Sequence, residues 1–186
     1  MEISETLYVS TRPDWRAWLE ANHGTEDEIW LVSYRKATGR PSLPYNVAVE
    51  EALCFGWIDS IRKGIDDERY AQRFTPRRPG SGYSQTNKER LARLAALGKL
   101  ISAVRDDLEA NRPEDYEIPQ DIQSALRSDP AVWDFFTGTS PAYQRIRAAY
   151  VDIARNRPRE FDKRLSNLVA KSADRKQFGY HIGDLY

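Results

Sequence analysis

Four polar residues in the segment between positions 73 and 87 could bind an anion. They are Arg73, Arg77, Ser84 and Asn87. The last two stand where a helix is expected to begin, and the first amides of a helix have no intrahelical acceptor and carry a partial positive charge. Guanidinium and hydroxyl groups beside such amides can hold phosphate or carboxylate groups. We therefore predict a site for a small anionic ligand here. The alternative is a solvated loop whose arginines pair with Asp59, Asp66, Asp67 or Glu68.

The string Gly56-Trp57-Ile58-Asp59 joins a helix-like pattern to a strand-like one. In a binding site, Trp57 would form one wall of a cleft and Asp59 would orient a donor of the ligand. In a purely architectural interpretation, Gly56 would end the helix at positive φ, Trp57 would fill the seam between helix and sheet, and Asp59 would order a turn or pair with an arginine. Residue-type preferences favour the architectural interpretation.

Other reactive side chains do not form a recognisable catalytic set. Cys54 lies in an apolar segment, so we expect a buried and unreactive thiol. His23 and His181 lack metal-ligand spacing, and we predict no metal and no cofactor. Glu50 and Glu51 are adjacent rather than one helical turn apart, so we expect that their carboxylates do not converge as an acid and a base would. Enzymatic activity is thus disfavoured but left open.

The composition narrows the class of partner and the compartment. The chain has 186 residues, with 28 basic and 28 acidic side chains that cancel to zero net charge. This balance argues against nucleic acid as a partner. We find no apolar run of about 18 to 20 residues, the length that a membrane span needs. The chain has one cysteine and begins without a secretory signal pattern, so we expect a soluble, cytoplasmic protein.

Hydrophobic periodicity and turn residues indicate the elements that would position these groups. We predict a helix over 11–24, a strand over 28–37 that is buried on both faces, and a helix from Asn46 to about Gly56. Strands over 57–63 and 69–75 would form a hairpin. The fold class is therefore α+β, with a small antiparallel sheet between residues 28 and 75 that is covered by helices.

The rest of the chain is predicted to be helical. Thr86 and Glu89 have the spacing of a capping box, so a helix should begin at Thr86 and end near Gly98. After a proline-bracketed connector, one helix capped by Ser140 should present Tyr143, Ile146, Tyr150 and Ile153, and a later helix should face it with Phe161, Leu165, Leu168 and Val169. We predict an α+β domain over 1–112 and a helical module over 113–186.

Several long strings carry a family resemblance. EALCFGWIDS, followed by IDDERYAQRFTPRR and YSQTNKERLARLAALG, resembles the YdeI/OmpD-associated family, also described as bacteriocin-protection proteins. SPAYQRIRAAYVDIARNRPREFDKRLSNLV resembles the helical module of that family. The resemblance implies a bacterial α+β protein linked to antimicrobial-peptide tolerance, to stress tolerance and to an outer-membrane porin. It supplies no catalytic residues, and the missing signal segment does not support an envelope location.

Two functions from different classes follow from these observations. In the first, the protein is a ligand-binding module whose pocket lies between the sheet and the helix that begins at Thr86. Its ligand-binding residues would be Trp57, Asp59, Arg73, Arg77, Ser84 and Asn87. In the second, it is an adaptor whose helical module and aromatic tail, QFGYHIGDLY, bind a protein partner or a second copy of the chain. The tail would dock either on its own fold or on that partner.

Overall fold

A computed structural model describes residues 2–78, 80–110 and 112–179. The chain divides into two compact units. The first comprises Met1–Gly82 and Arg93–Ala110, and the second comprises Tyr83–Ala92 and Asn111–Tyr186. Helix α3 (Gln85–Ala96) therefore contributes residues to both units.

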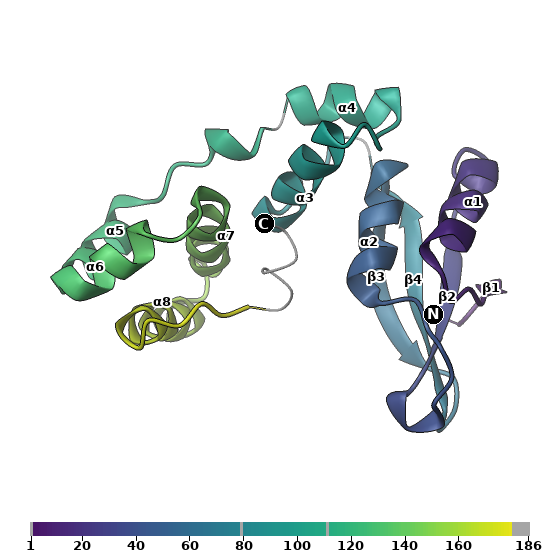
Figure 1. Cartoon of the computed structure of the whole chain (residues 1–186), viewed down its shortest axis with the longest axis horizontal. Helices are drawn as coiled ribbons and strands as arrows, with labels where there is room; N and C mark the ends of the chain where they lie inside the picture. Colours follow the sequence, from purple (N-terminus) through teal and green to yellow (C-terminus); the bar gives the residue numbers. More distant parts are fainter. Residues whose placement is uncertain (1, 79, 111, 180–186) are drawn as a thin grey trace. The chain divides into compact units, whose positions relative to one another are not determined.

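The first unit contains a mixed four-stranded sheet with the strand order β1-β2-β4-β3 (Figure 1). The strands are β1 (Thr6–Leu7), β2 (Ile29–Tyr34), β3 (Trp57–Gly64) and β4 (Arg69–Pro76). The antiparallel pairs β2–β4 and β3–β4 confirm the predicted strands and hairpin. The expectation of a wholly antiparallel sheet is wrong at one edge, because β1 pairs with β2 in parallel. Two residues are too short to show the alternation by which a strand is recognised.

The strands form where their side chains can be buried or their turns satisfied. The first five residues of β2 are buried, as its apolar content predicts for a strand covered on both faces. The β3–β4 turn is closed by Asp66, whose Oδ1 accepts the amides of Glu68 at 3.0 Å and Arg69 at 2.7 Å. Asp66 thus supplies acceptors that the turn backbone lacks.

Helices α1 (Arg12–Asn22) and α2 (Tyr45–Cys54) lie against the sheet (Figure 1). The Thr11 side chain accepts the amide of Asp14, which confirms Thr11 as a cap. The predicted cap at Asn46 is wrong, because α2 already begins at Tyr45 after the extended residue Pro44. Proline has no amide hydrogen to donate, and Pro44 is extended, so the helix begins at the residue that directly follows it. Helix α4 (Ser102–Glu109) and the short η1 (Lys36–Thr38) complete the helices of this unit.

The joint after α2 has the predicted architecture. Gly56 adopts φ +73°, and a Cβ atom built there would lie 3.3 Å from a methyl group of Val104 in α4. Glycine therefore permits both the left-handed conformation and the close approach of α4. Trp57 is fully buried, its Nε1 donates to the carbonyl oxygen of His23 at 3.0 Å, and its ring packs edge-on against Trp18.

Helix α3 begins one residue earlier than predicted. The side chain of Ser84 accepts the amide of Asn87 at 3.3 Å, and its carbonyl oxygen accepts the amide of Lys88. Ser84 is thus the N-terminal cap, and the predicted capping box of Thr86 and Glu89 is wrong. The carboxylate of Glu89 instead accepts from Arg145 at 2.6 and 2.9 Å and from the side-chain amide of Gln85 at 2.9 Å.

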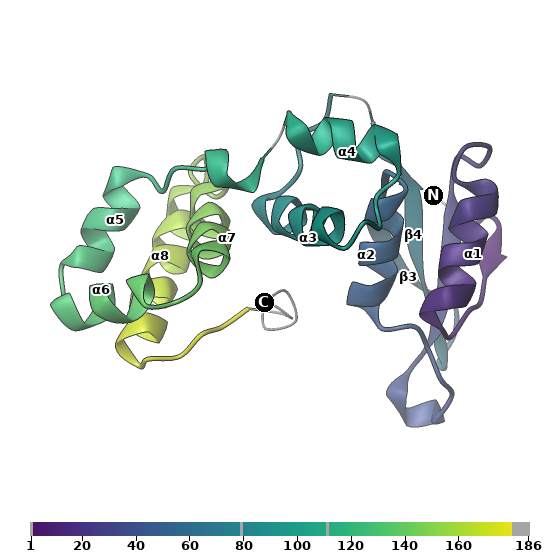
Figure 2. The same cartoon turned by 45° about the horizontal axis from the view of Figure 1, so that its top comes forward.

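The second unit packs its helices around one hydrophobic core (Figure 2). After the short η2 (Pro113–Asp115), the helices are α5 (Gln120–Arg127), α6 (Pro130–Thr137), α7 (Pro141–Asp152) and α8 (Pro158–Ala173). Buried residues of all four form this core, and they are Ile122, Leu126, Val132, Phe136, Ala148, Val151 and Leu168. The described residues contain no helix that is long and apolar enough to cross a membrane.

The contact between α7 and α8 differs in part from the predicted stripes. Ser140 caps α7 as predicted, and Tyr143 and Ile146 are buried. Tyr150 and Ile153 are instead 43% and 72% exposed. Ala148 and Val151, whose smaller side chains let α8 approach, share the core with Leu168 in their place.

Part of the carboxy-terminal tail docks on its own unit. Phe178 packs against the core of the second unit, and its amide donates to the hydroxyl of Tyr143 at 3.3 Å. Residues 180–186 of the predicted aromatic tail lie outside the described residues.

Candidate functional site

The six residues predicted to bind a ligand are distributed over both units. Trp57, Asp59, Arg73 and Arg77 belong to the first unit, and Ser84 and Asn87 belong to the second. Trp57 serves the core, as described above. Asp59 lies on β3 and accepts a hydrogen bond from the hydroxyl of Tyr45 at 2.7 Å, which ties the strand to the start of α2.

Carboxylates bind both predicted arginines of the first unit. Nε of Arg73 donates to Oε2 of Glu28 at 2.6 Å, and Nη1 of Arg77 donates to Oδ2 of Asp107 at 2.6 Å. Hydrogen bonds from Ser4 and from Arg73 lower the pKa of Glu28. These are neither of the two situations that the sequence suggested, since the partners are Glu28, which directly precedes β2, and Asp107 in α4. Whether Arg73 and Arg77 also bind a ligand stays a prediction.

Ser84 lies beside a cavity of about 390 Å³ within the second unit. The cavity is bounded by the start of α3, by Tyr116 and by one side of α7. Its lining residues are Tyr83, Ser84, Gln85, Thr86, Lys88, Tyr116, Ile146, Arg147, Ala149, Tyr150, Asp152 and Ile153. Asn87 lies on the same turn of α3, where its Oδ1 accepts from Arg90 at 2.9 Å.

The electrostatics of this cavity favour a negative charge. Because Ser84 takes the amide of Asn87, the amides of Gln85 and Thr86 stay at the positive end of α3 without an intrahelical acceptor. Lys88 adds a cation that makes no ion pair within the described part of the chain. Among the described residues of the lining, the only carboxylate is that of Asp152, which binds Arg155 at 2.7 Å.

Arg147 supplies a second positive charge to the cavity wall. Only 8% of the residue is exposed. The centre of its guanidinium group lies 5.4 Å from the ring centre of Tyr150 and 5.2 Å from that of Phe178. Two aromatic rings therefore fix the direction of this cation. The docked tail residue Phe178 thus helps to build the wall.

Tyr116 places a polar group without a partner in the lining. Its hydroxyl is buried and makes no hydrogen bond to the described residues. Burial, followed by the charge of Asp152, raises the pKa of Tyr116, so the hydroxyl keeps its proton at neutral pH. A protonated hydroxyl can donate to an anion. Buried polar groups in native proteins are nearly always paired, so this one marks a place where an acceptor is missing.

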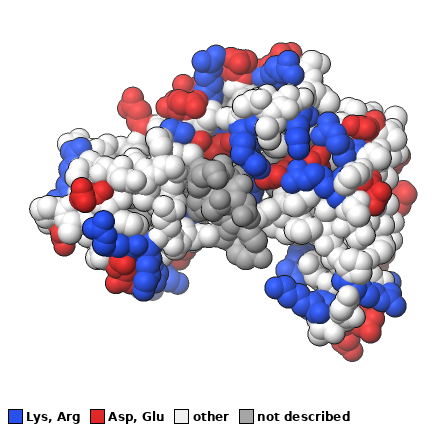
Figure 3. Space-filling view, viewed as in Figure 1, with Lys and Arg blue, Asp and Glu red and all other residues white. Residues whose placement is uncertain are grey.

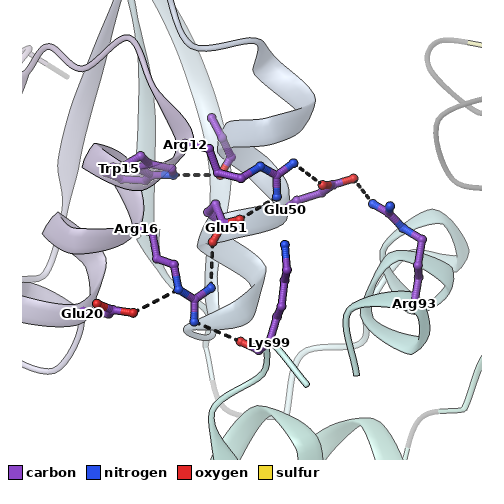
Figure 4. A network of polar contacts seen from close by, with 9 residues as sticks. Arg12, Trp15, Arg16, Glu20, Glu50, Glu51, Arg93 and Lys99 are labelled. Atoms are coloured by element: carbon purple, nitrogen blue, oxygen red, sulfur yellow. Dashed lines mark hydrogen bonds and ion pairs between the residues drawn. The ribbon is translucent and has the colours of Figure 1, made fainter. Parts of the chain in front are cut away.

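A second polar cluster lies in the first unit, where the sequence predicted none (Figure 4). Glu50 and Glu51 are 5% and 1% exposed. Arg12 donates to Oε2 of Glu50 at 2.9 Å and to Oε1 of Glu51 at 2.6 Å. One guanidinium from α1 therefore joins the two carboxylates, and the expectation that they do not converge as an acid and a base would stays a prediction.

Two further arginines complete this cluster. Nη1 of Arg16 donates to Oε2 of Glu51 at 2.9 Å, and Nη2 of Arg93 donates to Oε1 of Glu50. Burial lowers the pKa of Arg12, but its hydrogen bonds with Glu50 and Glu51 outweigh burial and raise that pKa overall. We call these five residues, Arg12, Arg16, Glu50, Glu51 and Arg93, the arginine–glutamate network. No local sequence pattern predicts this network, because each arginine lies 35 to 43 residues from the glutamate that it binds.

Cys54 lies at the end of α2 and is fully buried, as predicted. Burial, reinforced by the charge of Glu51, raises the pKa of the thiol to about 11. The thiolate is the reactive form of cysteine, so this thiol is unreactive at neutral pH. Within the described residues, no group of histidine, cysteine and acidic side chains is arranged to hold a metal ion.

Comparisons with known families cover both halves of the chain. Residues 7–106 match a domain of unknown function, DUF8412, and residues 115–175 match the family described as bacteriocin-protection, YdeI or OmpD-associated. The chain belongs to the DUF8412 family, and its resemblance to the YdeI/OmpD-associated family is confirmed over 115–175. No curated protein and no solved structure matches the chain. The string EALCFGWIDS falls within the domain of unknown function.

Proposed function

We propose that this member of the DUF8412 family, with its YdeI/OmpD-associated segment, is a binding module for a small anionic ligand. The ligand would occupy the cavity beside the start of α3. One observation carries the proposal: two cations, a helix N-terminus and a buried hydroxyl without a partner all line one cavity.

The size of the cavity supports a small molecule. Its volume of about 390 Å³ falls in the range of roughly 300 to 1,000 Å³ that is typical of ligand pockets. A protein segment would need a longer groove. The cavity therefore fits a metabolite-sized ligand.

The lining indicates two chemical ends for this ligand. The charged end would lie near Lys88, Arg147 and the amides at the start of α3, which together favour a carboxylate or phosphate group. The uncharged end would contact Ile146 and Tyr150, whose side chains are apolar or aromatic. A carboxylate or phosphate joined to a flat or apolar group matches both ends.

The biological context comes from the family alone. The family matched by residues 115–175 is described by bacteriocin protection. We propose that binding of a small anion is the contribution of this chain to such protection. Of the residues predicted from the sequence, Ser84 lines the cavity, and Asn87 lies on the adjoining turn.

A thermal-shift screen with single-charge variants tests the proposal. The purified protein is heated with carboxylates, sugar phosphates, nucleotides and amino acids, and a ligand at one hundred times its Kd adds about 2.7 kcal/mol of stability. We expect a hit whose effect is lost in Lys88→Gln. The matched control is Lys171→Gln, which removes a lysine at the end of α8, away from the cavity lining.

Two results would contradict the proposal. The first is a hit that stabilises Lys88→Gln as strongly as the parent protein. The second is a screen without any hit, although the protein melts cooperatively. The second result would favour the adaptor function, in which the helical module and the aromatic tail bind a protein partner.

A further inference from the structure

In the arginine–glutamate network of the first unit, the three arginines bind every carboxylate oxygen of the two glutamates. Each of the four carboxylate oxygens of Glu50 and Glu51 accepts from one guanidinium: Arg12 takes one oxygen of each glutamate, Arg93 the other oxygen of Glu50, and Arg16 the other oxygen of Glu51. The carboxylates therefore hold the three arginines in fixed positions.

The network presents its arginines outward and its carboxylates inward. The side chains of Arg12, Arg16 and Arg93 are 35%, 32% and 34% exposed, whereas those of the two glutamates are 7% and 1% exposed. Lys and Arg side chains gather over α2 and its surroundings on the face drawn in Figure 3. A solvent-borne anion would therefore meet guanidinium groups first.

Lys99 adds a fourth cation to the same place. Its carbonyl oxygen accepts from Nη2 of Arg16 at 3.4 Å, which fixes its backbone beside the network. Its side chain extends toward the carboxylates in Figure 4. The ammonium group makes no ion pair or hydrogen bond with the described residues. This lysine thus brings a positive charge that the protein itself does not neutralise there.

The charges around the network leave a positive surplus. The cations are Arg12, Arg16, Arg93 and Lys99, and the carboxylates are those of Glu50, Glu51 and Glu20, which binds Nε of Arg16. Four cations against three carboxylates leave one positive charge. Nε of Arg93 is in addition buried without a hydrogen-bond partner among the described residues.

We propose that Arg12, Arg93 and Lys99 bind a tetrahedral oxyanion, such as a phosphate group, at the outer edge of the network. Guanidinium groups can offer two parallel donors to a phosphate, and a lysine acts as a mobile point charge beside them. Glu50 and Glu51 serve as the support that keeps the arginines in place. This site lies in the first unit and does not depend on the cavity of the second.

Titration with inorganic phosphate tests this site directly. The Kd of the full chain for phosphate is measured by calorimetry, with potassium chloride at equal ionic strength as the reference. Lys99→Gln removes the charge without touching a contact of the network. We expect the Kd to rise about tenfold, the change that corresponds to one lost charge-assisted hydrogen bond. Lys36→Gln, an exposed lysine of η1, is the matched control and should leave the Kd unchanged.

Each other outcome would overturn the proposal. An unchanged Kd in Lys99→Gln would show that the network is structural only. Equal binding signals for chloride and phosphate would mean that the signal reports ionic strength and not binding of an oxyanion. A Kd that rises in Lys88→Gln but not in Lys99→Gln would place the phosphate in the cavity of the second unit, so the failure of this proposal is distinguishable from the failure of the proposed function.

Discussion

The arginine–glutamate network and the cavity beside α3 differ in whether their buried polar groups are paired within the protein. In the network, every carboxylate oxygen of Glu50 and Glu51 is bound by an arginine of the same unit. In the cavity, Lys88 and the hydroxyl of Tyr116 have no such partner among the described residues. Paired buried groups hold elements together, whereas unpaired ones are available to a ligand. The comparison therefore separates buried carboxylates that arginines of the same unit satisfy from a cavity in which a buried hydroxyl is left without a partner among the described residues.

Glu51→Gln should have the largest effect on stability, because it removes a fully buried charge that binds both Arg12 and Arg16. We expect a loss of about 3 kcal/mol in the free energy of unfolding, the lower end for breaking a buried pair, since both arginines are partly exposed. Urea unfolding followed by tryptophan fluorescence measures it, and four of the five tryptophans lie in the first unit.

Glu20→Gln is the control for that measurement. Its side chain is 56% exposed and, among the described residues, its carboxylate pairs with Arg16 alone, so the loss should stay below about 0.5 kcal/mol. Equal losses for the two variants would mean that the network adds nothing beyond a surface pair.

The alkylation rate of the Cys54 thiol measures how well the protein around Glu51 shields this thiol from solvent. Its pKa of about 11, compared with 9.0 for a free thiol, leaves about one hundred times less thiolate at pH 8. We expect alkylation at pH 8 to be slower by about that factor than in urea-unfolded protein, and to accelerate in Glu51→Gln. Because burial raises this pKa, labelling should speed up as pH rises towards 11. A rate equal to that of the unfolded chain would contradict the buried position.

Ser84→Ala should have a smaller effect, on the cavity side of the comparison. The lost cap at the start of α3 should cost about 1 kcal/mol of stability. Thr86→Ala, by contrast, should change stability little, because Thr86 lies inside the helix. Thermal unfolding measures both. A larger loss for Thr86→Ala would restore the capping box that the sequence suggested.

Local chemistry explains which parts of the fold could be predicted from the sequence. The hairpin, β2, the glycine at position 56 and the caps Thr11 and Ser140 all follow from neighbouring residues, and the structure confirms them. Strand β1 could not be predicted in this way, because only its pairing with β2 makes two residues a strand. The cap of α3 was misplaced by two residues, since two hydroxyl residues, Ser84 and Thr86, compete for that position.

The candidate sites depend on longer-range contacts. Ser84 was predicted because its position before a helix is a local feature. Lys88 and Tyr116 join it only after the chain has folded, and neither has a distinctive sequence context. Glu50 and Glu51 show the limit most clearly: their adjacency gave no reason to expect convergence, and Arg12, which joins them, lies 38 and 39 residues away.

The most direct test of the binding function is calorimetry of Tyr116→Phe with the best anionic ligand from the screen. This substitution removes one hydroxyl and no charge, and that hydroxyl makes no bond to the described residues. The proposed function predicts a melting temperature without ligand that is equal to or above that of the parent protein, together with a Kd that rises by about five- to tenfold. An unchanged Kd would contradict the placement of the ligand in this cavity.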